Sequence, residues 1–273
     1  MSASGLFNKP WKILSAEERA RLGEAFHAAA DQGDLDAVKK LHAAGADVNY
    51  SHVNLGTALI AAAGENHAPV VDYLLKNKAG VRLCNMFNQS ALHIAIRQGA
   101  DNAIALSLIE AASPLNERDT HGATPSFYAA QNANADVLEA LAKKCADFTI
   151  ANKKGVTPLM QATMASHADA IDVLVKYKCG LDQQDDEGRT ALMHAVIGRN
   201  AGLVEKYLSL GANFDLRDKG GETAAAIANR LPGAGKISEL LDSAAAARLM
   251  PFHAGTDSSV TIMKRLVLKG TAI

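Results

Sequence analysis

Apolar residues in this chain recur in short helical patterns, and the same arrangement returns at a constant interval along the sequence. Small residues cluster in runs such as 61–63 and 129–130, which lets neighbouring helices approach closely. Each run is followed by apolar residues at helical spacing, for example within residues 70–75. The pattern therefore predicts pairs of helices, a first one rich in small residues and a second one that is amphipathic.

A threonine or serine leads each predicted pair, in steps of 33, 34, 33, 33 and 33 residues. Its hydroxyl suits a helix start, and the prolines that follow two of these residues suit the first helical position. One period earlier, residues 24–27 continue the pattern without the leading threonine. The chain is thus expected to hold seven units between residues 24 and 243. The leading residues are Thr57, Ser90, Thr124, Thr157, Thr190 and Thr223.

The second helix of a unit is expected to end at glycine, as at Gly45 and Gly211, because glycine suits a left-handed terminating residue. A loop with Asp or Asn and Gly then leads to the next unit. Four units lack glycine at the terminating position. They have Lys78, Ala111, Cys145 and Lys178 there.

These motifs resemble the ankyrin repeat, whose pattern is D-x-x-G-x-T-P-L-H-x-A-A followed by a second helix and G-A-D-V-N. The resemblance implies an all-α solenoid of stacked helix pairs with projecting β-turn or hairpin loops. It assigns 1–23 to an N-terminal extension and the start of a capping helix, 24–243 to seven repeats, and 244–273 to a C-terminal tail. Ser15 and Glu18 fit a capping box at the start.

Composition narrows the functional classes. The chain has 28 Lys plus Arg against 29 Asp plus Glu, which argues against a general nucleic-acid binder. It has no apolar stretch long enough to span a bilayer and no secretory leader pattern. Its three cysteines lack metal-ligand spacing, so reduced thiols in the cytoplasm are expected. We expect no cofactor and no metal.

The sequence gives little support to a catalytic function. His194 is a polar residue in a mostly apolar first helix, and Cys145 and Cys179 are expected near helix ends. No recognised motif places an acid and a base beside either thiol. Residues 233–236 resemble part of a phosphate loop, but the glycine required before them is Arg230. No catalytic residue is therefore predicted.

The resemblance implies that loop tips and the exposed side of the first helices form a concave surface for protein recognition. Large apolar residues at a tip, such as Met86 and Phe87, are candidate anchors unless they fold back against Val81 and Leu83. Val53 and Asn54 share this surface. The partner-binding residues expected from the register are Met86, Phe87, Gln89, Arg97, Gln98, His121, Gln131, Asn132, Lys153, Lys154, Met164, Asp186, Glu187 and Arg189.

The leading hypothesis is a noncatalytic, monomeric interaction protein that binds another protein as scaffold, adaptor or inhibitor. It is not expected to bind nucleic acid directly or to insert into a membrane. One alternative is an enzyme or enzyme subunit that uses His194, Cys145 or the C-terminal tail. Another is a bacterial effector that acts on host proteins. Trp11 and the tail remain possible contact sites, or they cover the ends of the repeat stack.

Overall fold

The computed structural model describes residues 14–249, which fold into helix pairs joined by loops and divide into two compact units. Unit 1 ends at Lys153 and unit 2 begins at Lys154. The fold is all-α, as expected. The helices of unit 1 are α1 (Ala16–Asp31), α2 (Leu35–Ala43), α3 (Ala58–Gly64), α4 (Ala68–Lys76), α5 (Ala91–Arg97), α6 (Asn102–Glu110), α7 (Pro125–Gln131) and α8 (Ala135–Lys143). Those of unit 2 are α9 (Pro158–Met164), α10 (Ala168–Lys176), α11 (Ala191–Ile197), α12 (Ala201–Ser209), α13 (Ala224–Arg230) and α14 (Gly235–Leu249).

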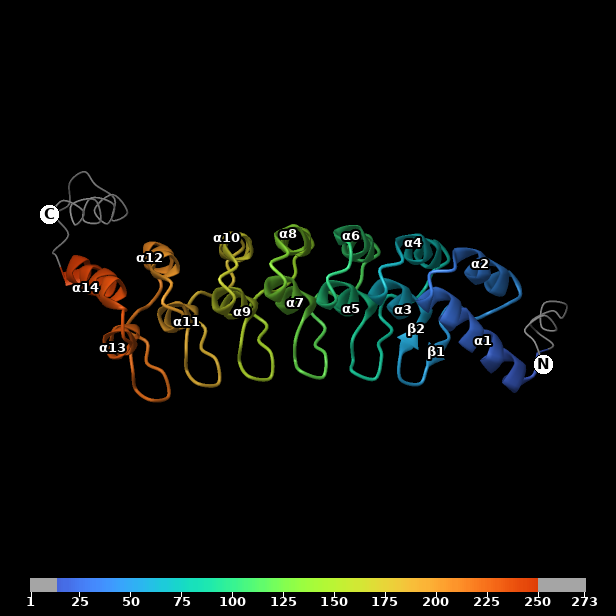
Figure 1. Cartoon of the computed structure of the whole chain (residues 1–273), viewed down its shortest axis with the longest axis horizontal. Helices are drawn as coiled ribbons and strands as arrows, with labels where there is room; N and C mark the ends of the chain where they lie inside the picture. Colours follow the sequence, from blue (N-terminus) through green and yellow to red (C-terminus); the bar gives the residue numbers. More distant parts are fainter. Residues whose placement is uncertain (1–13, 250–273) are drawn as a thin grey trace. The chain divides into compact units, whose positions relative to one another are not determined.

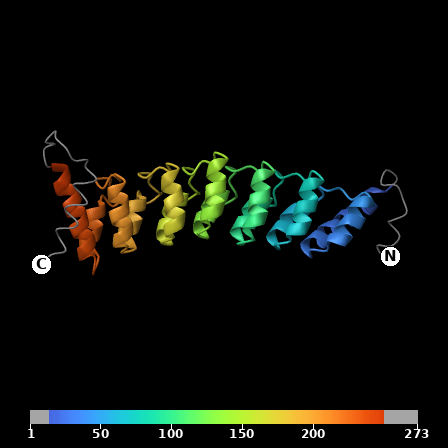
Figure 2. The ribbon, with the colours of Figure 1, turned by 90° about the horizontal axis from the view of Figure 1, so that it is seen from above.

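Within each unit the helices form two rows (Figure 1). In unit 1 the first helices α1, α3, α5 and α7 pack in succession, and α2, α4, α6 and α8 pack as a second row. In unit 2 the first-helix row is α9, α11 and α13. Seen from above, successive pairs within a unit lie side by side in chain order (Figure 2). The loops project from the first-helix row.

Serine and threonine begin the first helices through their side chains. The Ser90 hydroxyl accepts from the amide of His93, and the Thr124 hydroxyl accepts from the amide of Phe127. The residues that follow are almost all buried, because first helices pack on both neighbours. Second helices bury only one stripe, such as Val70, Val71 and Leu74 in α4.

Two of the loops in unit 1 contain antiparallel backbone pairing. Strand β1 (Ser51–His52) pairs with β2 (Gly56–Thr57), with Ser51 opposite Thr57. In the next repeat a single bridge joins Cys84 and Ser90. The projecting hairpin loops implied by the resemblance are thus present.

The two ends of the described chain extend past the repeat boundaries expected from the register. Helix α1 begins at Ala16 with the predicted capping box, since the Ser15 hydroxyl accepts from the amide of Glu18 at 3.1 Å and Glu18 accepts from the amide of Ser15 at 2.8 Å. Helix α14 continues to Leu249. Trp11 and the tail beyond Leu249 lie outside the described residues.

Nonglycine residues do adopt the left-handed conformation at the ends of second helices. Lys78, Cys145 and Lys178 have φ of 62°, 63° and 58°. The expectation for Ala111 is wrong, because the left-handed residue of that repeat is Ala112, at 59°. The repeat led by Ser90 has one additional residue in the turn between α5 and α6, which moves α6 and its end by one position.

Replacing Lys78 or Lys178 by glycine is expected to stabilise the protein. A left-handed conformation costs a residue with a Cβ roughly 1 to 2 kcal/mol, and glycine avoids that cost. Glycine also gains entropy in the unfolded chain, so a net gain of about 0.5 kcal/mol per site is expected in denaturant unfolding.

The matched control is Lys76→Gly, at the last residue of α4. Lys76 is exposed but right-handed, so glycine there should lower the free energy of unfolding by up to about 1 kcal/mol. Loss of stability in both Lys78→Gly and Lys178→Gly would contradict the strain argument.

Two buried histidines of unit 1 couple stability to pH. His93 is fully buried beneath the loop, where its ring contacts the Ser90 hydroxyl and the Glu117 carbonyl. Burial lowers the pKa of His93 below its ordinary value of 6.5. Burial also lowers the pKa of His27, and the electrostatic effect of the neighbouring His52 lowers it further.

Acid should therefore destabilise unit 1. Both histidines have lower pKa values folded than unfolded, so the unfolded chain takes up protons first as pH falls. The stability that the two lowered pKa values contribute is fully present above pH 6.5. It is lost as the pH falls from 6.5 toward the pKa values of the folded protein. Thermal midpoints measured from pH 7.5 to 5.5 should fall, and His93→Gln should reduce the slope. An unchanged slope in His93→Gln would refute the assignment to that residue.

Candidate protein-binding surface

An Asp or Asn side chain at the start of a loop holds the backbone of that loop. Asp119 Oδ1 accepts from the amides of His121 at 2.8 Å and Ala123 at 2.9 Å. Asn85 Oδ1 accepts in the same way from Phe87 at 2.9 Å and Gln89 at 3.0 Å. The same two-and-four spacing in two loops shows why these positions need a short side chain with an acceptor oxygen.

The second oxygen of Asp119 ties its loop to helices and to the preceding repeat. It accepts a hydrogen bond from the Tyr128 hydroxyl of α7 at 2.6 Å and one from the side-chain amide of Gln89 at 3.1 Å. Burial alone would raise the pKa of Asp119, but these bonds and those from the backbone outweigh it and hold the pKa below its ordinary value. Burial and the contact with Asp119 raise the pKa of Tyr128 to about 12.

This contact corrects one predicted site residue. Gln89 was expected to meet a partner, but its side chain is only 1% exposed. Its amide is used inside the protein to donate to Asp119 of the next repeat. The register alone places Gln89 on the loop; it does not reveal that the side chain turns inward.

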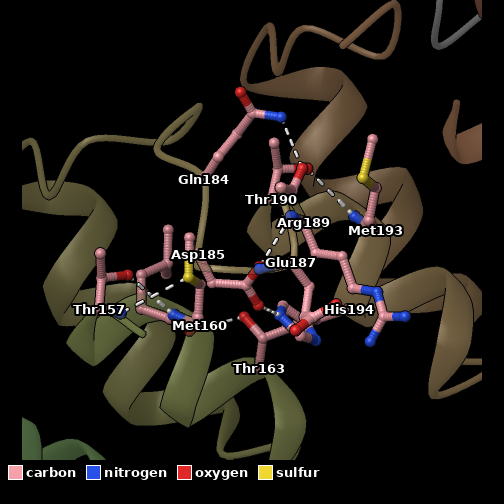
Figure 3. A network of polar contacts seen from close by, with 12 residues as sticks. Thr157, Met160, Thr163, Gln184, Asp185, Glu187, Arg189, Thr190, Met193 and His194 are labelled. Carbon is pink, nitrogen blue, oxygen red and sulfur yellow. Dashed lines mark hydrogen bonds and ion pairs between the residues drawn. The ribbon is translucent and has the colours of Figure 1, made fainter. Parts of the chain in front are cut away.

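Unit 2 uses the same device with a histidine. Asp185 Oδ1 accepts from the amides of Glu187 at 2.9 Å and Arg189 at 2.8 Å, while Oδ2 lies 2.8 Å from His194 Nε2 (Figure 3). The side chains of His194 and Asp185 are 9% and 6% exposed. His194 stands four residues after Thr190, the place that Tyr128 takes after Thr124. It therefore holds a loop.

Backbone hydrogen bonds join neighbouring tips within each unit. In unit 1 the Thr120 amide donates to the Phe87 carbonyl, and the Lys153 amide donates to the His121 carbonyl, both at 2.9 Å. In unit 2 the Asp186 amide donates to the Lys154 carbonyl at 3.0 Å. The tips of a unit are thus fixed relative to one another while their side chains point outward.

Most of the predicted partner-binding residues have exposed side chains. Met86 and Phe87 are 58% and 50% exposed, so a large part of each side chain is accessible to a partner. Arg189 is half-buried. The exposed residues of unit 1 are Met86, Phe87, Arg97, Gln98, His121, Gln131, Asn132 and Lys153, and those of unit 2 are Lys154, Met164, Asp186 and Glu187.

Sequence reasoning missed two exposed apolar residues. Leu55, across the hairpin turn from Val53, is 54% exposed. Ile197 is exposed at the end of α11, seven residues after its leading threonine, as Met164 is in α9. The shared spacing would have indicated Ile197, whereas Leu55 depends on the hairpin register.

The described cysteines and histidines give little support to a catalytic or metal-binding function. Cys179 is buried, and burial raises the pKa of its thiol to about 12, so the reactive thiolate is disfavoured. Cys145 is exposed at a left-handed helix end. Residues 14–249 contain no group of three or more potential metal ligands. Within that same range no helix is long and apolar enough to cross a membrane.

Comparison with known families agrees with this geometry. A family model of three ankyrin repeats matches residues 26–119 and 101–185, and the single ankyrin repeat matches residues 187–219. The chain belongs to the ankyrin-repeat family. It therefore carries a protein-interaction module.

Two curated relatives match part of the chain. The chain is 32% identical over 132 residues to the probable 26S proteasome regulatory subunit p28 of Saccharomyces cerevisiae. This match covers 47% of this chain and 58% of the yeast protein. It is 30% identical over 123 residues to the phosphocholine transferase AnkX of Legionella pneumophila, over 43% of this chain and 13% of that protein. The chain thus spans little more than half of the first relative and a small part of the second.

Solved structures agree on the fold. The ankyrin repeat domain of Bcl-3, described as a unique member of the IkappaB family, has a TM-score of 0.70 at 22% identity and covers 80% of this chain and 97% of that one. The ankyrin repeat protein EF0377 has a TM-score of 0.64 at 26% identity, over 71% of this chain and 98% of that one.

Asp185→Ala is expected to destabilise unit 2 by about 1 to 3 kcal/mol, because it leaves the amides of Glu187 and Arg189 and the ring of His194 without their acceptor. Asp186→Ala is the matched control, since the neighbouring carboxylate is exposed and should change stability by less than about 0.5 kcal/mol. Asp185→Asn should restore much of the loss, as Asn85 does the same work in unit 1. Equal unfolding free energies for Asp185→Ala and Asp186→Ala would refute the anchoring role.

Proposed function

We propose that the protein is a noncatalytic scaffold, adaptor or inhibitor that binds a partner protein through its loop tips and the exposed ends of its first helices. The observation that carries this proposal is that buried and exposed side chains of the loops have different roles. Buried side chains such as Asp119 and Asp185 fix the backbone, and exposed side chains such as Phe87, His121 and Asp186 lie beside them on the same or neighbouring loops. A backbone that is already fixed binds a partner with little ordering cost.

Several features support the noncatalytic reading. His194, the residue on which an enzyme hypothesis depends most, is engaged by Asp185 as a loop anchor. The similarity to a phosphocholine transferase covers only 13% of that protein, too little to carry its activity over to this chain. We find no specific observation that favours an effector role.

The yeast relative supports the kind of role proposed. Its name describes a probable regulatory subunit of the 26S proteasome. We propose a comparable role for this chain, as a monomer that attaches to a partner. The three free cysteines, Cys84, Cys145 and Cys179, support the cytoplasm as its compartment.

Substitutions on the tips should abolish partner binding without unfolding the protein. The full-length chain would be used to purify its partner from source cells, and affinities would then be measured with purified proteins. Phe87→Ala should weaken binding by more than about 1 kcal/mol if it is an anchor. Arg97→Ala and Lys154→Ala should mainly slow association and alter its salt dependence.

The control carries substitutions on the second helices. A variant with Lys39→Ala, Asp72→Ala and Glu205→Ala changes exposed residues on α2, α4 and α12. It should retain full affinity. The proposed surface is wrong if this control loses the partner while the combined variant of Phe87, Arg97 and Lys154 keeps it.

A further inference from the structure

Two consecutive loop tips of unit 1 present large apolar side chains. Val53 and Leu55 are 88% and 54% exposed on the hairpin between β1 and β2, and Met86 and Phe87 are similarly exposed on the next loop. We call these four residues the apolar tips. They are the most exposed large apolar side chains in unit 1 as described.

The two loops that carry the apolar tips touch each other. A Cβ added to Gly56, at the base of the hairpin, would lie 3.2 Å from the Cβ of Asn85 and 3.3 Å from its Cα. The hairpin therefore packs against the loop that Asn85 organises. Four exposed apolar residues on two touching loops form one patch, and such patches mark contact sites.

The polar contacts that hold these loops do not involve the apolar side chains. The loop of Phe87 is held by the side-chain oxygen of Asn85, and the carbonyl of Phe87 accepts from Thr120. The hairpin is held by its pairing of His52 with Gly56 and by the ring contact of His52 with His27. Neither arrangement uses an apolar tip side chain.

The next two tips of unit 1 are basic. Arg118, His121 and Lys153 are exposed there, and we call them the basic tips. The Arg118 side chain donates to the Gly122 carbonyl at 3.2 Å, which holds it beside its own loop. Across residues 50–57, 83–90, 116–124 and 149–153, all of them described, Glu117 is the single exposed acidic side chain.

The apolar and basic tips follow one another along a strip. The carbonyl of Phe87 accepts a hydrogen bond from the amide of Thr120, in the loop of His121. The carbonyl of His121 accepts one from the amide of Lys153. Neighbouring helices pack about 8 to 10 Å apart, so four successive tips span roughly 30 Å. An extended chain rises about 3.3 Å per residue, so some nine residues reach along the strip.

Resting on the proposed function, we infer that the tips of unit 1 bind an extended segment of a partner protein that is apolar at one end and acidic at the other. Its apolar side chains pack on Val53, Leu55, Met86 and Phe87. Its carboxylates pair with Arg118 and Lys153 and accept a hydrogen bond from the His121 ring.

Charge distinguishes this occupant from the protein's own termini. Residues 1–13 contain Lys9 and Lys12 and no acidic residue. Residues 250–273 contain three Lys or Arg and one Asp, at position 257. By sequence both segments are net positive, so neither matches an occupant with an acidic end.

The test is selection of random peptides of about 12 residues, displayed on phage, against the full-length chain, a length set by the estimated span of the strip. Selected peptides should combine apolar residues in one half with two or more Asp or Glu in the other. Peptides without an acidic excess, or no enrichment at all, would overturn the inference.

Three variants locate the binding of a selected peptide. Arg118→Glu, His121→Glu and Lys153→Glu together should weaken it roughly tenfold or more and abolish its salt dependence. Serine at all four apolar tips should weaken it to a similar degree. Lys219→Glu, an exposed residue on a loop of unit 2, is the control and should have little effect.

Unchanged thermal midpoints would show that each variant is folded. Peptide binding that survives both unit 1 variants would overturn the inference. A native partner that binds through unit 2 alone would do the same, and would leave the proposed function standing. A native partner that ignores the tips of both units would contradict the proposed function itself.

Discussion

In three of the loops one short side chain at the start accepts hydrogen bonds from the amides two and four residues later, and the recognition surface depends on it. Asp119 and Asp185 do this from nearly buried positions, and Asn85 does it with an amide oxygen. Without that acceptor the loop amides would have to find water, and the tips would lose a single conformation. Everything proposed about binding rests on tips that are already fixed.

The second oxygen of the acidic residues extends the order of one loop to its surroundings. In unit 1 Asp119 reaches Tyr128 in its own repeat and Gln89 in the preceding one. In unit 2 Asp185 reaches His194. These bonds keep the side chains of Tyr128, Gln89 and His194 inside the protein and hold the loops on the first helices.

Sequence alone predicted the elements that depend on local chemistry. The threonine-led starts, the capping box of Ser15 with Glu18 and the left-handed Lys78 and Lys178 follow from contacts within a few residues. The shift from Ala111 to Ala112 was missed because counting from Ser90 does not show where in the repeat the additional residue sits.

The candidate surface was less predictable, because exposure depends on the neighbouring repeat. Gln89 turns inward because Asp119, thirty residues later, accepts its amide. Leu55 turns outward because the hairpin register pairs His52 with Gly56 and leaves the turn uncovered. Neither contact can be read from one repeat, so the register identifies a loop and the folded stack decides which of its side chains a partner can reach.

The most direct measurement is amide hydrogen exchange of the free protein at Thr120 and Lys153. Both residues are exposed, yet their amides donate to the carbonyls of Phe87 and His121. A surface fixed before binding predicts exchange far slower than in an unstructured chain, without any partner present. Exchange at the rate of an unstructured chain, with protection appearing only in a complex, would show that the partner orders the tips and would contradict the account.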